Sequence, residues 1–253
     1  VRVWVEVDPG YRRSGASWSD EGLLAALAQQ IEAASHLHFQ GVLCHAGNTY
    51  GARSREEVQR IHAETIERMV AARDTLGIAS GRGDLQISVG DTPACSMLDD
   101  LGPVDEIRPG NFVFYDLTQL TIGACAVDEI AVAVACPVVG IYPERRELVL
   151  YGGAVHLSKD ALALGSDGAS FGRIAPLTPD GWGQPFPETD LRSVSQEHGI
   201  VRVADSAWSE VGGTLQIGDL VAVLPVHSCL TANLLKRYLT LQGHVIEMAP
   251  IPR

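Results

Sequence analysis

The first half of the chain alternates short apolar runs with longer amphipathic stretches, and this alternation limits its fold more than any other feature. The apolar runs predict strands over residues 1–7, 39–44, 85–89 and 104–107. The amphipathic stretches predict helices over residues 19–37, 54–77 and 94–101. Ser19 is expected to cap the first helix, while a capping box at Ser54 opens the second and Gly77 ends it. Strands that alternate with helices form a parallel sheet, so this half is predicted to be α/β.

The pattern changes after about residue 125. Further apolar runs predict strands over residues 130–142, 146–150, 199–203 and 220–226, with no long helix between them. Glycine pairs and Gly-Asp steps between these runs mark turns. The sequence therefore predicts two domains, an α/β domain over residues 1–125 and an antiparallel β domain over residues 126–253.

Polar residues and glycines gather just after the predicted strands of the first half. In parallel α/β proteins, ligands bind at the carboxyl ends of the strands, and glycine turns let backbone N–H groups approach a phosphate. Ordinary turns between strand and helix are the alternative for each position alone. The residues concerned are Asp8, Gly10, Arg13, His45, Gly47, Asn48, Tyr50, Gly90, Asp91, Thr92, Arg108, Gly110 and Asn111.

Four of these side chains could take part in chemistry. Arg13 and Arg108 are suited to contacts with an anion or a ring nitrogen, although solvated arginines are the default. A lone histidine such as His45 is structural more often than catalytic. Tyr50 could act as an acid or base, or it could simply cover a pocket.

A His-x-Cys pair closes the last predicted strand of the second half. On a strand, His227 and Cys229 would point to the same face and present an imidazole beside a thiol. These are side chains that zinc prefers, and two of them could make an open site completed by water or substrate. A buried, inert cysteine beside a core histidine is the alternative.

Charge and cysteine usage exclude some classes of partner. The formal net charge of −12 argues against nucleic acid and anionic membranes. No apolar run approaches the ~18 residues of a transmembrane helix, and the first residues have no signal-peptide pattern. Five scattered cysteines predict free thiols in a reducing, cytoplasmic setting.

Taken in order, the motifs of both halves resemble one family. They are Asp8-x-Gly10-x-x-Arg13-x-Gly15, Cys44-His45-Ala46-Gly47-x-x-Tyr50, Val89-Gly90-x-Thr92-Pro93, Glu106-Ile107-Arg108-Pro109-Gly110-Asn111, Glu197-His198-Gly199 and His227-x-Cys229-x-Thr231-x-Asn233-Leu234. This set is similar to the D-serine dehydratase and D-threonine aldolase family, alanine-racemase-like fold III enzymes that use pyridoxal phosphate. The resemblance implies a TIM-type β/α barrel followed by a β domain, and a homodimer is expected on the same ground.

The resemblance also implies roles for the candidate residues. Arg13 or Arg108 would lie near the pyridine nitrogen, and Tyr50 and His45 would line the ring or substrate pocket as candidate catalytic residues. Thr92, Gly110 and Asn111 would contact the cofactor phosphate. His227 and Cys229 would hold a metal, and the cysteine favours zinc over a harder ion. The implied function is a pyridoxal-phosphate- and metal-dependent lyase acting on a small-molecule D-β-hydroxy amino acid, by elimination or by cleavage.

Two departures from the family pattern keep other functions open. The family's Schiff-base lysine lies near the start of the barrel, and neither Lys159 nor Lys236 matches it. Because the chain begins in a strand and shows only part of a barrel, it is expected to be the carboxyl-terminal part of such an enzyme and to be inactive alone. The segment from Tyr151 to His156 replaces an expected Asp-Ala-Gly type segment, which leaves the substrate open. An amino-acid racemase of the same fold and a non-catalytic fragment or pseudoenzyme are the alternatives.

Overall fold

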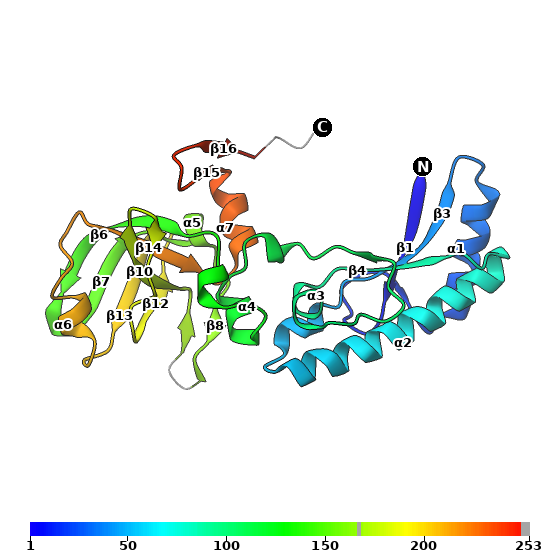
Figure 1. The fold of residues 1–253 in the computed structure, drawn as a ribbon, viewed down its shortest axis with the longest axis horizontal. Helices are drawn as coiled ribbons and strands as arrows, with labels where there is room; N and C mark the ends of the chain where they lie inside the picture. The colour runs from blue at the N-terminus through cyan, green and yellow to red at the C-terminus, as the bar shows by residue number, and fades with distance from the viewer. Residues whose placement is uncertain (166–167, 249–253) are drawn as a thin grey trace. The chain divides into compact units, whose positions relative to one another are not determined.

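The computed structural model describes residues 1–165 and 168–248, and the chain divides into two compact units (Figure 1). The first unit comprises residues 1–112 and 121–124. The second comprises residues 113–120 and those from Cys125 onward. The structure confirms the predicted order of an α/β unit followed by an antiparallel β unit.

The first unit contains a parallel sheet of five strands in the order β2-β1-β3-β4-β5. This is the arrangement of part of a β/α barrel, as predicted. Its strands are β1 (Arg2–Asp8), β2 (Ala16–Ser17), β3 (His38–Leu43), β4 (Gln86–Val89) and β5 (Glu106–Ile107). Its helical segments are α1 (Glu21–Ala33), η1 (Gly47–Gly51), α2 (Arg55–Ser80), α3 (Thr92–Met97) and η2 (Asn111–Val113).

Helices α1 and α2 lie side by side against this sheet (Figure 1) and bury an apolar core. Their faces contribute Leu24 and Met69, which pack with Phe39, Val42 and Ile87 of the strands. All five side chains are at most 1% exposed. Burial of large apolar side chains stabilises a fold by roughly 1.5–3 kcal/mol each, so this contact holds the layers together.

Several helix ends differ from the predicted ones: α1 ends at Ala33 instead of residue 37, and α3 runs over Thr92–Met97 instead of 94–101. Helix α1 is capped by Asp20, whose carboxylate accepts the Leu23 N–H at 3.0 Å, rather than by Ser19. Helix α2 begins as predicted, with the Ser54 hydroxyl accepting the Glu57 N–H at 3.2 Å. It continues past Gly77 and ends at Gly81, whose φ of 72° is the left-handed conformation that glycine adopts at little cost.

The second unit contains an antiparallel sheet of seven strands in the order β11-β10-β14-β6-β7-β13-β12. These strands are β6 (Val134–Tyr142), β7 (Glu147–Tyr151), β10 (Gly172–Thr178), β11 (Gly181–Trp182), β12 (Thr189–Val194), β13 (His198–Val203) and β14 (Leu220–Pro225). Two strand pairs stand beside it, β8 (Leu162–Ala163) with β9 (Ala169–Ser170), and β15 (Arg237–Leu239) with β16 (Val245–Glu247).

The seven-stranded sheet curls so that its far strand returns to its start. The Phe171 N–H, just before β10, donates to the Leu191 carbonyl of β12 at 2.7 Å. The enclosed core includes Val138, Leu150 and Val223. Short helical segments connect the strands: α4 (Leu117–Ile122), η3 (Val127–Glu129), η4 (Pro143–Arg145), α5 (Ala154–Leu157), α6 (Trp208–Val211) and α7 (Ser228–Leu235).

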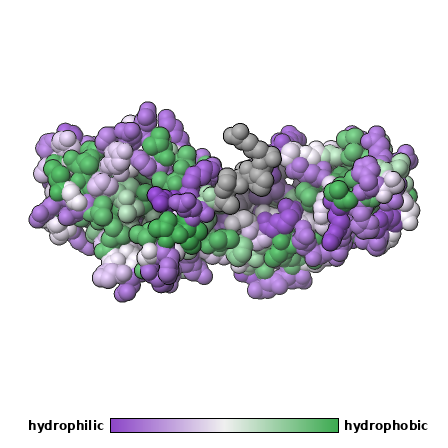
Figure 2. Space-filling view, turned by 90° about the horizontal axis from the view of Figure 1, so that it is seen from above, coloured by the Kyte–Doolittle hydropathy of each residue, from purple (hydrophilic) through white to green (hydrophobic). Residues whose placement is uncertain are grey.

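The surface of the described residues mixes polar and apolar side chains (Figure 2). Exposed apolar side chains on β15, β16 and the turn between them include Leu239, Leu241, Val245 and Ile246. Within residues 1–165 and 168–248, no helix combines the length and apolar character needed to span a membrane.

Candidate functional site

Arg108 lies across the carboxyl ends of the central strands of the parallel sheet. Its Nε donates to the Ser88 hydroxyl at 2.7 Å, and its Nη2 donates to the carbonyl oxygens of Cys44 at 3.1 Å and Ser88 at 3.2 Å. These bonds join β5 to the ends of β3 and β4, with Glu106 3.5 Å away as an ion-pair partner. The guanidinium is therefore held in one place at the edge of the sheet where parallel α/β proteins bind ligands.

His45 and Arg13 line one small pocket, together with Asp8 and Tyr11. The His45 Nδ1 is 3.2 Å from the Gly90 carbonyl, and because a carbonyl can only accept, Nδ1 carries the proton in that bond. The Tyr11 and Tyr50 rings lie 6.1 and 5.9 Å from the His45 ring. The structure thus brings His45, Tyr50 and Arg13 into one neighbourhood and adds Tyr11 to it.

The predicted phosphate contacts lie on two adjacent turns, after β4 and after β5. Thr92 begins α3, one residue after Asp91 and two residues earlier than the predicted helix start. The buried Asp91 carboxylate accepts the Ala94 N–H and the Thr49 hydroxyl, both at 3.0 Å, so it occupies part of the helix N-terminus. Burial raises the pKa of Asp91, while these hydrogen bonds lower it less.

The Thr92 hydroxyl is available for a hydrogen bond to a ligand. Its side chain is fully buried, and its hydroxyl has no hydrogen-bond partner within residues 1–165 and 168–248. Asn111 is also buried, at 5% exposed, and Gly110 has open space where a side chain would begin. A buried hydroxyl without a partner costs free energy, and a phosphate oxygen would supply the missing acceptor. These residues therefore fit the phosphate of pyridoxal phosphate.

The metal pair does not lie on a strand, which corrects the sequence prediction. Strand β14 ends at Pro225, His227 precedes helix α7, and Cys229 lies in the first turn of that helix. The helix begins here because the Ser228 N–H bonds to a side chain from a distant segment, Asp116, instead of to a neighbouring strand. His227 and Cys229 still meet, since a side-chain hydrogen bond links them.

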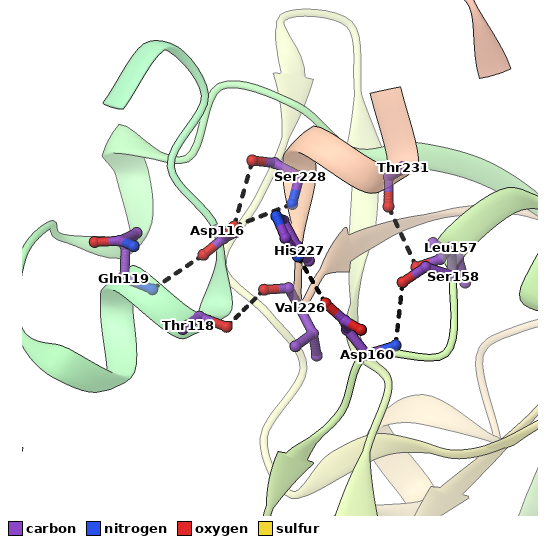
Figure 3. A network of polar contacts seen from close by, with 10 residues as sticks. All are labelled: Asp116, Thr118, Gln119, Leu157, Ser158, Asp160, Val226, His227, Ser228 and Thr231. Atoms are coloured by element: carbon purple, nitrogen blue, oxygen red, sulfur yellow. Dashed lines mark hydrogen bonds and ion pairs between the residues drawn. The ribbon is translucent and has the colours of Figure 1, made fainter. Parts of the chain in front are cut away.

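The backbone on both sides of His227 is fixed by the first turn of α4 (Figure 3). The Thr118 hydroxyl donates to the Val226 carbonyl at 2.8 Å. The Asp116 carboxylate, only 1% exposed, accepts the Ser228 N–H at 3.0 Å through one oxygen. Its other oxygen accepts the Gln119 N–H at 3.0 Å, so one carboxylate caps α4 and α7 together.

Asp160 fixes the ring of His227. Its Oδ2 lies 2.7 Å from Nδ1 of the imidazole. Hydrogen bonding to Cys229 is the largest influence and raises the pKa of His227 to about 9, with further raising by Asp160 and by the charge of Asp116, while burial opposes it. The protonated ring is thus favoured when no metal is bound.

This donor set fits a divalent metal in an open site. With Nδ1 bonded to Asp160, the other ring nitrogen of His227 is left to act as a ligand beside the Cys229 sulfur. Within the described residues, no group of three or more His, Cys, Asp or Glu side chains could hold a metal ion. The two donors alone match a site that leaves positions for water or substrate.

Neither lysine lies in the unit that contains the parallel sheet, where the candidate cofactor-binding residues are found. Lys159 is exposed in the turn between α5 and β8. Lys236 is exposed at the end of α7, where its ammonium donates to the Asn233 side chain. Both belong to the second unit and not to the parallel sheet.

Sequence reasoning missed the residues that hold the candidates in place. Asp160 follows Lys159 and has no motif of its own, and Tyr11 occupies an unassigned position of the first motif. Asp116 carried a readable signal, since Asp-x-x-Gln is a capping pattern at a helix start. Its second task, at α7, involves a residue 112 positions away and leaves no local signal.

Two family models match the chain in succession. Residues 1–117 match the alanine racemase N-terminal domain, and residues 131–241 match the putative serine dehydratase domain. The residues after the parallel strands lie in the first match, and His227 and Cys229 lie in the second.

Curated relatives extend this match over nearly the whole chain. A D-serine dehydratase from Dictyostelium discoideum is 30% identical over 253 residues, which cover 97% of this chain and 60% of the relative. A D-threo-3-hydroxyaspartate dehydratase from Delftia sp. HT23 has a solved structure with a TM-score of 0.84 and 29% identity, covering 97% of this chain and 64% of that one. The chain thus spans about 60% of the length of the curated relatives it matches.

Two variant structures of a D-threo-3-hydroxyaspartate dehydratase are also similar to this chain. One carries a cysteine-to-alanine change and is in the metal-free form, and the other carries a histidine-to-alanine change. Their TM-scores are 0.84 and 0.83 at 28% identity, covering 97% of this chain and 64% and 63% of theirs. The two changed positions are two residues apart in that enzyme.

Proposed function

We propose that the chain belongs to the D-serine dehydratase family of alanine-racemase-like proteins, whose models and relatives it matches, and that the complete protein is a lyase of D-β-hydroxy amino acids. The proposed reaction removes water from the substrate, as in a D-serine dehydratase. The proposed cofactors are pyridoxal phosphate and a divalent metal, with zinc preferred because one donor is a thiolate.

One observation carries the metal part of the proposal. His227 is held through Nδ1 by Asp160, which leaves its other nitrogen beside Cys229. This is the arrangement in which histidine binds metals, with a carboxylate on the far side of the ring. The variant structures support it, because the histidine and cysteine changed there have the same spacing as His227 and Cys229.

The residues after the parallel strands would hold the cofactor. Thr92, Gly110 and Asn111 would contact the phosphate, while Arg108 or Arg13 would lie near the ring nitrogen and Tyr50 and His45 beside the ring. When bound, pyridoxal phosphate supplies an electron sink for charge at the substrate Cα, and the metal supplies a Lewis acid for the β-hydroxyl. The chain's own contribution is to fix Arg108 and His45 on strand-end carbonyl groups, so that both side chains are aimed before any ligand arrives.

The first test changes His227 to Ala in the complete protein. We expect bound zinc to be lost and release of ammonia and 2-oxo acid from D-β-hydroxy amino acids to fall by roughly 100-fold or more, since a ligand matters at least as much as the groups that orient it. His244→Ala, at an exposed histidine of the same unit, is the matched control. Unchanged zinc content and turnover in His227→Ala would contradict the proposal.

Product analysis separates the remaining alternatives. Elimination yields ammonia and a 2-oxo acid, cleavage between Cα and Cβ yields glycine and an aldehyde, and a racemase yields the opposite enantiomer without zinc. A non-catalytic chain would show none of these products while still binding zinc. For the 253-residue chain alone, we expect no borohydride-stable pyridoxal adduct on Lys159 or Lys236.

The proposal also covers the oligomeric state and the cellular location of the protein. A homodimer is proposed from the family resemblance alone. A reducing, cytoplasmic location is proposed because Cys44, Cys95, Cys125 and Cys136 form no disulfide in the structure.

A further inference from the structure

The turn that carries Asp160 is fixed by its own hydrogen bonds (Figure 3). The Asp160 N–H donates to the Ser158 hydroxyl at 3.1 Å, and the Ser158 N–H donates to the Ala154 carbonyl at 3.0 Å. The Thr231 hydroxyl of α7 donates to the Leu157 carbonyl at 3.4 Å. The turn is therefore tied to the same helix that carries Cys229, so Asp160 and Cys229 share one support.

The backbone of His227 has little freedom left. Thr118 holds the peptide group before it, and Asp116 holds the peptide group after it. What remains is rotation of the imidazole about its two side-chain bonds, and the ring is still partly exposed, at 38% of its side chain. A single partner on the ring is thus enough to decide where its second nitrogen points.

Asp160 is that partner. The two imidazole nitrogens lie on different sides of the ring, so a carboxylate at Nδ1 directs the other nitrogen away from itself. The carboxylate accepts a hydrogen bond from the Nδ1–H group and so selects the tautomer protonated at Nδ1, whose other nitrogen carries a lone pair. Asp160 cannot ligate the same ion through the oxygen that bonds Nδ1.

We propose that Asp160 is a positioning residue for metal binding, which aims the second imidazole nitrogen of His227 at the ion shared with Cys229. This inference rests on the metal role proposed above for His227 and Cys229. It adds a residue that touches neither the metal nor the substrate, and it assigns a task to a turn 67 residues away in the sequence.

The test compares Asp160→Ala and Asp160→Asn in the complete protein, with zinc as the probe and a competing chelator to measure affinity. Loss of such an orienting group weakens metal binding by roughly 10–100-fold, so we expect that loss in Asp160→Ala. Asparagine keeps one oxygen that can accept from Nδ1, so Asp160→Asn should recover part of the affinity. Asp205→Asn, at an aspartate with an 88% exposed side chain in the same unit, should bind zinc like the unchanged protein.

A second readout separates positioning from a general loss of structure. Cobalt substituted for zinc should show a changed visible spectrum in Asp160→Ala, while the unfolding midpoint of the metal-free protein stays near that of Asp205→Asn. If Asp160→Ala binds zinc as tightly as the unchanged protein, while His227→Ala and Cys229→Ala lose zinc, the positioning role is wrong and the metal site stands. If His227→Ala and Cys229→Ala keep normal zinc affinity, or the unchanged protein binds no zinc, both proposals are wrong.

Discussion

The two candidate regions differ in how their buried polar groups are satisfied. Around His227, Asp116, Thr118 and Asp160 each bond to a different part of the turn before α7. After the parallel strands, by contrast, the buried Thr92 hydroxyl and one oxygen of Asp91 have no hydrogen-bond partner within the described parts of the chain. The turn at His227 is organised in advance by the protein, although the side-chain amide of the nearby buried Gln119 also has no hydrogen-bond partner within the described residues. The residues after the parallel strands keep bonding capacity on a threonine and an aspartate that a ligand would complete.

Of the changes considered, removal of the Asp116 carboxylate is expected to lower the free energy of unfolding the most. In Asp116→Ala, the Ser228 N–H and the Gln119 N–H both lose their acceptor, and both residues are fully buried. Because two helix caps are lost at once, we expect the free energy of unfolding to fall by about 3 kcal/mol. Denaturant unfolding followed by the near-ultraviolet signal measures this fall.

Asp116→Asn is the graded comparison for that change. Its amide keeps a single oxygen, so only one of the two N–H groups can be accepted, and about half of the loss should remain. Equal stability of Asp116→Ala and the unchanged protein would show that the two helix starts do not depend on this carboxylate.

Two buried threonines offer a sharper test of the comparison. Thr92 and Thr49 are both fully buried, but the Thr49 hydroxyl already shares its proton between the Asp91 carboxylate at 3.0 Å and the Ala46 carbonyl at 2.9 Å. We expect Thr49→Val to lose about 1–2 kcal/mol of stability because it breaks existing bonds. We expect Thr92→Val to keep its stability without ligand, yet to bind pyridoxal phosphate about 10-fold more weakly, since a hydrogen bond to a charged group is worth roughly 1.5 kcal/mol.

Thermal unfolding without ligand and titration with pyridoxal phosphate separate these outcomes. A destabilised Thr92→Val protein with normal cofactor affinity would reverse the assignment and make Thr92 a structural residue.

The smallest expected effect concerns the pH dependence of the metal-free protein. The pKa of His227 is raised from 6.5 to about 9 in the folded chain, so its protonated form stabilises the fold. That contribution is complete below pH ~6.5 and disappears as the pH rises through about 9.

Comparison with His227→Asn isolates this contribution. In the presence of a chelator, the difference in unfolding midpoint between the two proteins should shrink between pH 6.5 and pH 9.5, because only one of them has the titrating ring. A difference that stays constant over this range would mean that the Asp160 and Cys229 contacts do not form before metal binds.

The sequence predicts much of the parallel unit because its determinants are local. Apolar runs located β1, β3 and β4, and the Ser54 cap located the start of α2. The end of α2 was wrong because Gly77 and Gly81 look alike in the sequence. In the structure, Gly81 takes the left-handed conformation, and Gly77 lies where a side chain would come within 2.7 Å of the Arg82 carbonyl.

The turn at His227 could not be predicted because its determinants are distant in the sequence. The motif singled out His227 and Cys229, and together with the other motifs it indicated the family resemblance. Their placement on a strand was wrong because Asp116, 112 residues away, bonds to the Ser228 N–H and starts a helix there. Asp160 is likewise distant in sequence, so the partners of a candidate site can be far less visible than its ligands.

The Asp116 carboxylate, which accepts the N–H groups of Gln119 and Ser228, also bears on the order of folding. The loop between Asp116 and Ser228 contains all seven strands of the large antiparallel sheet. Contacts between residues so far apart form late, because the intervening chain must first be brought together. The proposed metal site at His227 and Cys229 would therefore reach the described geometry only after that sheet has closed, which would place metal binding late in folding.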